Sequence, residues 1–413
     1  MRLTPSPNSP ASKAGFVILI LVALACGVSA TEKVLHNFAP PTGVSPEAGL
    51  IFDTAGNLYG TAQRGGGEWG TVVELSPNGD STWTTKVIHN FASGNDGQWP
   101  DGTLVFDAAG NLYGTTSLGG PVDNGVVFEC MPNGDGSWTE KVLYAFADGM
   151  DGAAPAGKLI FDAAGNLYGT TVAGGSYGIG TVFELMPDGS GVWTEKILHN
   201  FGHGEDGSYP LAGLMFDAAG NLYGTAWHGG TNNQGTVFEL SPNDSGGWTE
   251  KTLHNFGSGM DGTGSKADLV FDTAGNLFGT ASTGGSYGHG TVFELTPNGS
   301  GGWTERTVHN FRGGADGAYP GAGLIFDRAG NLYGTTENGG THSGGTAFEL
   351  MPDGSGGWTE KALHFFGEYY VDGLGPCGAL LFDSRTAAGK LYGTTEGGGG
   401  YGWGTVFEIT PDQ

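Results

Sequence analysis

Short apolar runs separated by turn residues recur along the whole chain. Between residues 157 and 201 four such runs follow one another, KLIFD, NLYGTT, GTVFEL and WTEKILHNF. Aromatic and β-branched residues are frequent in these runs, and Gly, Pro, Asn and Asp fill the segments between them, which is typical of β-strands joined by turns. The first turn, Asp162–Asn166, suits a bulged hairpin because Gly165 can adopt the left-handed conformation. The pattern predicts four antiparallel strands in this segment.

The same unit of four runs occurs seven times. Its most regular part is a stretch close to FDAAGNLYGTT, whose first Gly can be used to mark each copy: Gly56, Gly110, Gly165, Gly220, Gly275, Gly330 and Gly389. The spacings between these positions are 54, 55, 55, 55, 55 and 59 residues. A nearly fixed period of this length indicates a repeat architecture in which each copy is one structural unit.

The two ends of the chain each hold part of a unit. Residues 32–38 form a lone fourth strand, and the chain finishes with only three strands, so the whole adds up to seven sets of four. We therefore predict an all-β, seven-bladed β-propeller of four-stranded antiparallel blades, in which the N-terminal strand completes the last blade. Such closure leaves no exposed sheet edge. A parallel β-helix is the alternative, but its coils are shorter than this period.

The N-terminal segment predicts export. Residues 15–27 are apolar after a basic start, and Val28–Ala30 suits cleavage by a signal peptidase, so residues 1–30 resemble a secretory signal peptide. The apolar run is shorter than the roughly 20 residues that a spanning helix needs. We expect one propeller domain over residues 31–413 in a secreted, extracellular or periplasmic protein. Anchoring as a lipoprotein through Cys26 is the alternative.

Composition limits the class of partner. The chain has 42 acidic and 16 basic residues, a net charge of −26, and this charge repels nucleic acid and anionic membranes. The 82 Gly and 19 Pro are periodic, so they mark turns rather than disorder. We expect an extracellular glycan or protein as partner, no nucleic acid, no transmembrane segment in the mature chain, and a monomer.

The repeated block also resembles a known family. HNF, DG, GLIFD, GNLYGTT, GTVFEL and WTEK, in this order, are similar to the GloVer-type tandem repeat of exported bacterial proteins, and the likeness covers essentially all of residues 32–411. The resemblance implies export and a repeated, propeller-like β architecture. It implies no activity, because it brings no catalytic residues with it.

Repetition within one chain separates packing residues from candidates for a single site. A residue present in every copy is assigned to packing, which covers the Glu of VFEL. The His of LHNF, replaced by Tyr144 in one copy, and the Trp that occurs before TEK or its variants in six copies are assigned in the same way. Cys130 stands where other copies have Leu or Ile, so we expect it to be buried, whereas Cys377 falls in a connecting loop. Two G-x-S-x-G matches, at 174–178 and 284–288, lie between strands and lack the strand-to-helix context of a nucleophile elbow.

Residues outside the repeat pattern gather in loops that share one face of the ring. These are the loops between the second and third strands of a blade and the loops between blades. Their aromatic and histidine residues are our ligand-binding candidates: Trp69, Trp99, Trp227, Trp403, Tyr177, Tyr209, Tyr287, Tyr319, Tyr401, His203, His228, His289 and His342.

Six of the loops between blades contain an Asp-Gly pair. Asp-Gly is a common turn signal, and calcium binding by these carboxylates is the alternative, although no D-x-D-x-D-G loop supports it. The candidate metal ligands are Asp96, Asp151, Asp206, Asp261, Asp316 and Asp372. No other cofactor is predicted.

The sequence supports three hypotheses about function. The first is an exported binding or interaction propeller that recognises extracellular carbohydrate or a surface protein through the aromatic face, because flat rings suit sugar faces and also protein interfaces. The second is an extracellular polysaccharide hydrolase or lyase that uses the non-repeated His and Asp of that face. The third is a purely structural repeat protein. No catalytic residue is assigned, and whether the chain is an enzyme stays open at this stage.

Overall fold

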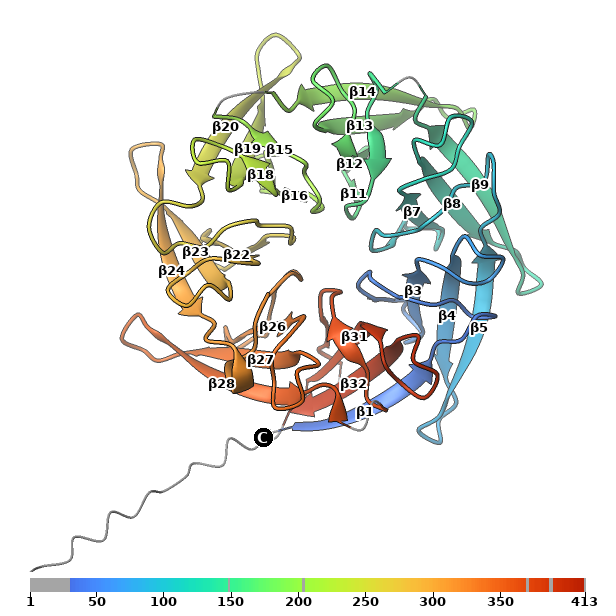
Figure 1. The fold of residues 1–413 in the computed structure, drawn as a ribbon. Coiled ribbons are helices and arrows are strands. Elements are labelled where there is room, and N and C mark those ends of the chain that lie inside the picture. The colour runs from blue at the N-terminus through green and yellow to red at the C-terminus, as the bar shows by residue number, and fades with distance from the viewer. Residues whose placement is uncertain (1–29, 148, 203–204, 369–370, 386–388, 412–413) are drawn as a thin grey trace, which may run out of the picture.

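The strands of the chain form seven blades around a central channel (Figure 1). The computed structural model describes residues 30–147, 149–202, 205–368, 371–385 and 389–411. The predicted signal peptide lies outside these residues, except for Ala30. In the part of the chain that is described, no helix is long and apolar enough to cross a membrane.

Each blade contains four main strands, here given from the axis outwards. The innermost strands are β2 (Ile51–Phe52), β6 (Val105–Phe106), β11 (Ile160–Phe161), β16 (Met215–Phe216), β21 (Val270–Phe271), β25 (Ile325–Phe326) and β30 (Leu381–Asp383). The second strands are β3 (Leu58–Ala62), β7 (Leu112–Thr116), β12 (Leu167–Ala173), β17 (Leu222–Ala226), β22 (Leu277–Ala281), β26 (Leu332–Thr336) and β31 (Lys390–Gly397). Blades are numbered 1 to 7 in this order.

The outer half of each blade holds the longer strands. The third strands are β4 (Thr71–Pro77), β8 (Val126–Pro132), β13 (Thr181–Pro187), β19 (Thr236–Pro242), β23 (Thr291–Pro297), β27 (Thr346–Pro352) and β32 (Thr405–Pro411). The outermost strands are β5 (Trp83–Asn90), β9 (Trp138–Ala145), β14 (Trp193–Asn200), β20 (Trp248–Asn255), β24 (Trp303–Asn310), β28 (Trp358–Phe365) and β1 (Ala30–Asn37).

Strand β1 closes the ring, as predicted. It pairs antiparallel with β32 from Ala30 opposite Pro411 to Asn37 opposite Thr405. Figure 1 shows β1, in blue, lying along the red β32 of blade 7. The seven-bladed, all-β fold is confirmed.

The inner strand of each blade is interrupted by a bulge that faces the axis. In blade 3, β10 (Ala153–Pro155) and β11 both pair with β12, and residues 156–159 between them leave the sheet. Blade 7 has the same arrangement through β29 (Leu374–Pro376), and blade 4 has a short extra pair, β15 (Gly207–Ser208) with β18 (His228–Gly229). A 3₁₀ turn, η1 (Gly314–Asp316), precedes blade 6. These bulges bring seven short segments to the channel.

The hydrophobic core lies between blades. Val182 and Phe201 of blade 3 pack with Leu222 and Phe238 of blade 4, and all four are fully buried. Because each cluster takes side chains from two neighbours, a blade cannot bury its apolar face alone, which is why the unit has to repeat. Cys130 is fully buried in the cluster of blades 1 and 2, which confirms its predicted role.

Candidate functional site: the channel mouth

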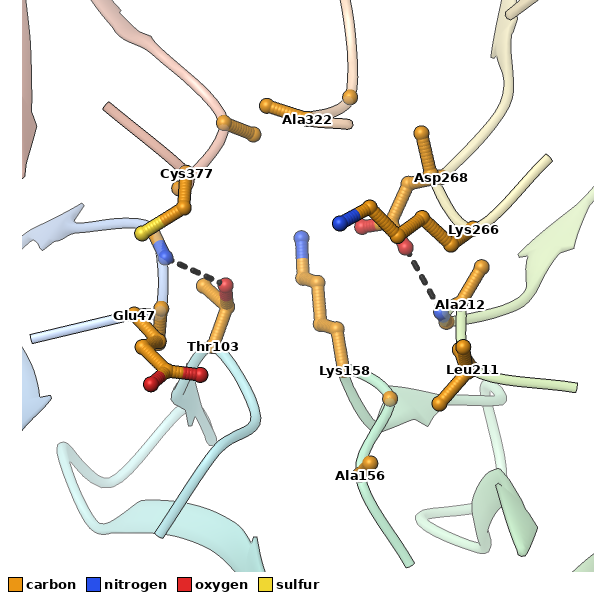
Figure 2. Close-up of a pocket in the computed structure, with 18 of the residues that line it drawn as sticks. Glu47, Thr103, Ala156, Lys158, Leu211, Ala212, Lys266, Asp268, Ala322 and Cys377 are labelled. Carbon is orange, nitrogen blue, oxygen red and sulfur yellow. Dashed lines mark hydrogen bonds between the residues drawn. The ribbon is translucent and has the colours of Figure 1, made fainter. Parts of the chain in front are cut away.

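Seven bulges meet in the central channel and line a cavity of about 100 Å³. Each bulge follows a Pro, or Ser265 in blade 5, and contributes three lining residues, except that of blade 2, which contributes two. Figure 2 shows Lys158 and Lys266 extending into the open centre of this cavity. The other polar lining side chains are Glu47, Asp101, Thr103, Asp268 and Cys377.

Hydrogen bonds between neighbouring blades hold the bulges in place. The hydroxyl of Thr170 in blade 3 donates to the carbonyl of Ala212 in the bulge of blade 4, at 2.9 Å. The same bond recurs as Thr225 to Ala267, Thr280 to Ala322 and Thr394 to Ala48. The backbone of the channel wall is therefore repeated around the ring, while its side chains differ from blade to blade.

One arc of the channel mouth is acidic. Glu47, Asp101, Glu337 and Glu396 come from blades 1, 2, 6 and 7. Burial, together with the charges of Asp101 and Glu396, raises the pKa of Glu47 to about 7. Burial also raises the pKa of Asp101, and burial with the charge of Glu337 raises that of Glu396. Each of these three carboxyl groups is therefore protonated more easily than a free carboxyl group of its kind.

The ammonium groups compensate little of this charge. Lys266 Nζ lies 2.6 Å from Glu337 Oε1, whereas Lys158 Nζ forms no hydrogen bond or ion pair with any residue of the described ranges. Asp268 of blade 5 instead accepts the backbone N–H of Gly213 at 2.6 Å.

The arc formed by blades 3 and 4 contributes no carboxyl group to the cavity lining. Ala156 and Leu211 line the cavity there together with Lys158. In blade 4 Trp227 is 40% exposed, and its backbone N–H donates to the carbonyl of Tyr209 at 3.2 Å. The mouth therefore has an acidic side and a side without carboxyl groups.

Three of the predicted aromatic residues occupy one equivalent backbone position. The residue before each bulge Pro, or before Ser265, has a positive φ in every blade: Ser45 54°, Trp99 57°, Ala154 55°, Tyr209 56°, Gly264 67°, Tyr319 61° and Gly375 65°. This left-handed conformation costs residues other than Gly about 1–2 kcal/mol. Blades 2, 4 and 6 nevertheless place a large ring at this position, where the other blades use Gly, Ala or Ser.

Neighbouring blades hold the backbone of these three aromatic residues. The backbone N–H of Trp99 donates to the carbonyl of Trp69 and that of Tyr319 to the carbonyl of His289, each at 2.9 Å, and that of Tyr209 donates to the carbonyl of Ile179 at 2.8 Å. Within blade 4 the Tyr209 ring lies edge-on to that of His228, with centroids 6.1 Å apart. The structure therefore brings six of the predicted site residues into three pairs around the mouth.

The remaining candidates are more scattered. Tyr177, Tyr287, Tyr401 and Trp403 are about half or more exposed in the loops between second and third strands, and His342 is exposed, with Nδ1 3.2 Å from the hydroxyl of Thr341. His203 lies outside the described residues. Within the described ranges, none of His228, His289 and His342 belongs to a group of three or more potential metal ligands.

The Asp-Gly carboxylates close the loops between blades. Asp96 accepts from the backbone N–H of Ala92 at 2.6 Å and lies 3.0 Å from His89 Nε2 on the preceding outer strand. The same bond to the outer strand is made by Asp151 with Tyr144 and, with a His, by Asp206, Asp261, Asp316 and Asp372. This geometry agrees with the turn role, and calcium binding by these residues stays a prediction.

Each of these Asp residues also faces a Glu on the outer strand of the next blade. Potential ligand atoms of His89, Asp96 and Glu140 lie within 4.8 Å of one another. Burial, followed by the charge of the neighbouring Asp, raises the pKa of the Glu to about 7 for Glu140 and about 8 for Glu32. We call this His/Tyr, Asp and Glu set the junction triad. It occurs at six of the seven contacts between blades.

The seventh junction differs at both acidic positions. Thr42 replaces the Asp, and its hydroxyl lies 3.2 Å from His36 Nε2. Thr85 replaces the Glu, and its hydroxyl lies 2.9 Å from His36 Nδ1. The two carboxyl groups are therefore present together or absent together. Burial beside a second carboxyl group therefore disfavours ionisation of the Glu of each pair.

Sequence analysis missed the bulge residues. The bulge after each Pro, or after Ser265, differs from copy to copy. A comparison of the copies, position by position, would therefore have found Glu47, Asp101, Lys158 and Lys266 as it found the variable aromatic and His residues. Cys377, assigned only to a connecting loop, lines the cavity, where burial raises the pKa of its thiol.

Comparison with known proteins supports the repeat architecture. No curated protein matches the chain. Among solved structures, an ancestral GH74 enzyme superposes with a TM-score of 0.58 at 10% identity, covering 93% of this chain and 51% of that chain. The chain thus spans about half the length of that enzyme, and the likeness shows the fold alone. A protein of unknown function from Dyadobacter fermentans matches with a TM-score of 0.48 at 12% identity, covering 92% of this chain and 97% of that one.

The repeat itself matches a described family three times in overlapping stretches. These are residues 21–215, 84–270 and 217–413. Together the matches extend over nearly the whole propeller. The chain belongs to the Gloeobacter/Verrucomicrobia repeat family.

Proposed function

We propose that this protein is an exported glycan-binding propeller whose ligand lies across the channel mouth. The observation that carries the proposal is the placement of Trp99, Tyr209 and Tyr319 in left-handed conformations. A bulky residue at such a position works against the local backbone preference, and costs of this kind gather at functional sites. These rings therefore have a role that the Gly, Ala and Ser of the other blades do not share.

The chemistry around the rings suits a sugar. Tyr209 and Tyr319 are each 37% exposed, so part of each ring is free to stack on a pyranose face. The carboxyl group of Glu47 can donate as well as accept hydrogen bonds near neutral pH, because its pKa is raised to about 7, and Asp101 adds a second carboxyl group. The cavity of about 100 Å³ is too small for a sugar ring, so only a substituent would enter it.

Glycine variants test this proposal without the usual risk of unfolding. Gly264 and Gly375 show that this position accepts Gly, so Tyr209→Gly and Tyr319→Gly relieve the backbone while removing the ring. We expect an unchanged or slightly higher melting temperature and at least about tenfold weaker polysaccharide binding, equivalent to about 1.4 kcal/mol. The measurement is calorimetric titration of the mature chain with a panel of plant and bacterial polysaccharides.

Ala154→Gly in blade 3 is the matched control, because it changes the same backbone position without removing a ring. It should leave binding unchanged. Retained binding in the double Tyr variant would exclude the aromatic mouth as the glycan site. A negative panel combined with capture of a surface protein by the same rings would assign the mouth to a protein partner instead.

A second candidate function is hydrolysis of the bound polysaccharide. It is favoured by Glu47, because a carboxyl group with a pKa of about 7 can donate a proton near neutral pH. Asp101 would be the second carboxyl group that glycoside hydrolysis needs. Glu47→Gln should abolish release of reducing ends while leaving affinity within about twofold. If no polymer that binds is cleaved, the protein is a binding module only.

A further inference from the structure

The face opposite the channel mouth carries a groove between neighbouring blades. Between blades 2 and 3 the groove has a volume of about 560 Å³ and is lined by Phe106, Asp107, Tyr113, Phe161, Asp162 and Trp193. Between blades 5 and 6 a groove of about 340 Å³ is lined by the equivalent residues, among them Phe278, Phe326, Asp327 and Trp358. These residues belong to the repeated hairpin turns, so the groove is a recurring feature of the ring.

The aromatic floor of the groove has the same geometry at different junctions. Between blades 2 and 3, the Tyr113 ring lies 5.1 Å from Phe161 at 90° and 6.4 Å from Trp193 at 62°. Between blades 7 and 1, the Tyr392 ring lies 5.2 Å from Phe52 at 84° and 6.3 Å from Trp83 at 65°. A group that occupies the groove at one junction therefore indicates which group the grooves at the other junctions could bind.

At the junction of blades 7 and 1 the chain places its own arginine on this floor. The guanidinium carbon of Arg385 lies 4.2 Å from the centroid of the Phe52 ring. Its Nε and Nη2 donate to the two carboxylate oxygens of Asp383 at 2.8 and 3.1 Å. Asp53, across the groove, adds a second negative charge. One groove is therefore occupied from within the molecule by a guanidinium group.

The other grooves present the same aromatic floor and the equivalent Asp residues. The Asp107 carboxylate accepts hydrogen bonds from its own turn, including the Tyr113 hydroxyl, so it attracts a cation by its charge. Arg328 is among the lining residues of the groove of blades 5 and 6, where it is exposed. Phe161 is the equivalent of Phe52, and Asp107 and Asp162 are the equivalents of Asp383 and Asp53. No cation–π contact involves these Phe residues within the described part of the chain, where Arg64, Arg312 and Arg385 make the three such contacts.

We propose that the grooves of the first five junctions, from blades 1–2 to blades 5–6, bind arginine side chains of a partner protein. Guanidinium is favoured over ammonium, because it is planar, stacks on aromatic rings and is more weakly hydrated. The net charge of −26 favours a basic partner, and several equivalent grooves on one face permit multivalent docking.

The junction of blades 6 and 7 is not part of this proposal. Its Tyr333 and Phe382 rings are stacked at 25° rather than edge-on, and Ala30 stands where the other junctions have Trp. The proposal is independent of glycan binding, because it concerns the opposite face.

Tryptophan indole resonances report each groove separately. We would titrate the mature chain with N-acetyl-arginine amide and follow the indole N–H signals by NMR. The signals of Trp138, Trp193, Trp248, Trp303 and Trp358 should shift in a saturable manner, while that of Trp83, beside Arg385, should not. The four tryptophans of the opposite face, Trp69, Trp99, Trp227 and Trp403, are internal controls and should not move. N-acetyl-lysine amide should shift the groove signals at least threefold less at equal concentration.

Two variants make the test decisive. Arg385→Ala should open the groove of blades 7 and 1, so that the Trp83 signal then responds to arginine. Phe161→Leu should remove the response of Trp193 alone, and the unchanged responses of the other grooves would show that the ring is intact. Equal responses to arginine and lysine, no response at Trp83 in Arg385→Ala, or shifts of the groove signals with oligosaccharides rather than arginine would each overturn the proposal.

Discussion

The channel mouth and the junction triads are built from the same repeat, yet they differ in how the copies vary. At the junctions six blades keep the same carboxyl pair, and the seventh replaces both members together. At the mouth each bulge keeps its backbone and changes its side chains. The comparison teaches that side chains repeated from blade to blade hold the blades together. Side chains that vary on a repeated backbone form a surface that is available for recognition.

The largest expected effect tests the repeated part. Phe238 is fully buried between blades 3 and 4 and occurs at an equivalent position in nearly every blade. Phe238→Ala should lower the free energy of unfolding by about 3–5 kcal/mol, because it leaves a cavity in a core that cannot fully collapse. Chemical denaturation measures this change. If folded molecules of the variant also lost glycan binding, the separation between packing and recognition would be wrong.

The next effect is the pH dependence of the junction triads. Burial and the neighbouring Asp raise the pKa of Glu140, Glu195, Glu305 and Glu360 to about 7, and that of Glu32 to about 8, above the usual 4.5. A group whose pKa is raised on folding stabilises the protein at low pH and loses this contribution as pH rises through the folded value. Stability should therefore fall as pH rises from about 4.5, the unfolded pKa, to about 8, the highest folded pKa. We expect a change on the order of 1 kcal/mol for each junction, after allowing for solvent screening of partly exposed groups.

Thermal unfolding across this pH range measures the effect, and single junctions can be isolated. Glu140→Gln keeps a hydrogen-bond donor and removes the titration, so the loss of stability between about pH 4.5 and pH 7 should become less steep. Thr85→Val, at the junction without carboxyl groups, should leave the slope unchanged. An unchanged slope in Glu140→Gln would contradict the raised pKa of Glu140.

A smaller effect tests the mouth through its glycines. A Cβ added at Gly264, where φ is +67°, would lie 3.0 Å from Trp227 Nε1. Gly264→Ala should therefore lower the free energy of unfolding by about 1 kcal/mol and displace the Trp227 ring. We expect glycan affinity to fall a few-fold, measured by the same titration. Unchanged affinity would place Trp227 outside the binding surface.

The smallest effect is expected at Ala154, the equivalent position of blade 3. This residue already has a φ of 55°, so Ala154→Tyr adds a ring without a new backbone cost. Stability should change by less than about 0.5 kcal/mol, while glycan affinity should rise about twofold. A loss of affinity would mean that blade 3 contacts the ligand through its small side chains.

Much of the fold followed from the sequence, and less of the site did. The period, the turn residues and the split unit at the two ends predicted seven blades and their closure by β1. The face on which Trp99, Tyr209 and Tyr319 lie also followed from strand order. Their shared left-handed conformation did not, because Trp and Tyr give no local signal for a positive φ. That acidic residues of four blades form one arc did not follow either, because the sequence does not show which variable side chains face one another across the channel.

The sequence by itself determined the repeating unit, because turn chemistry and strand patterning are local and each of the seven copies carries them. Tertiary structure alone decided which variable residues meet. Glu47 and Glu396 are more than three hundred residues apart, yet ring closure places them in one arc, where their charges act on each other. It also decided the protonation of that arc and of the junction triads, because burial and neighbouring charge exist only once the blades are packed together.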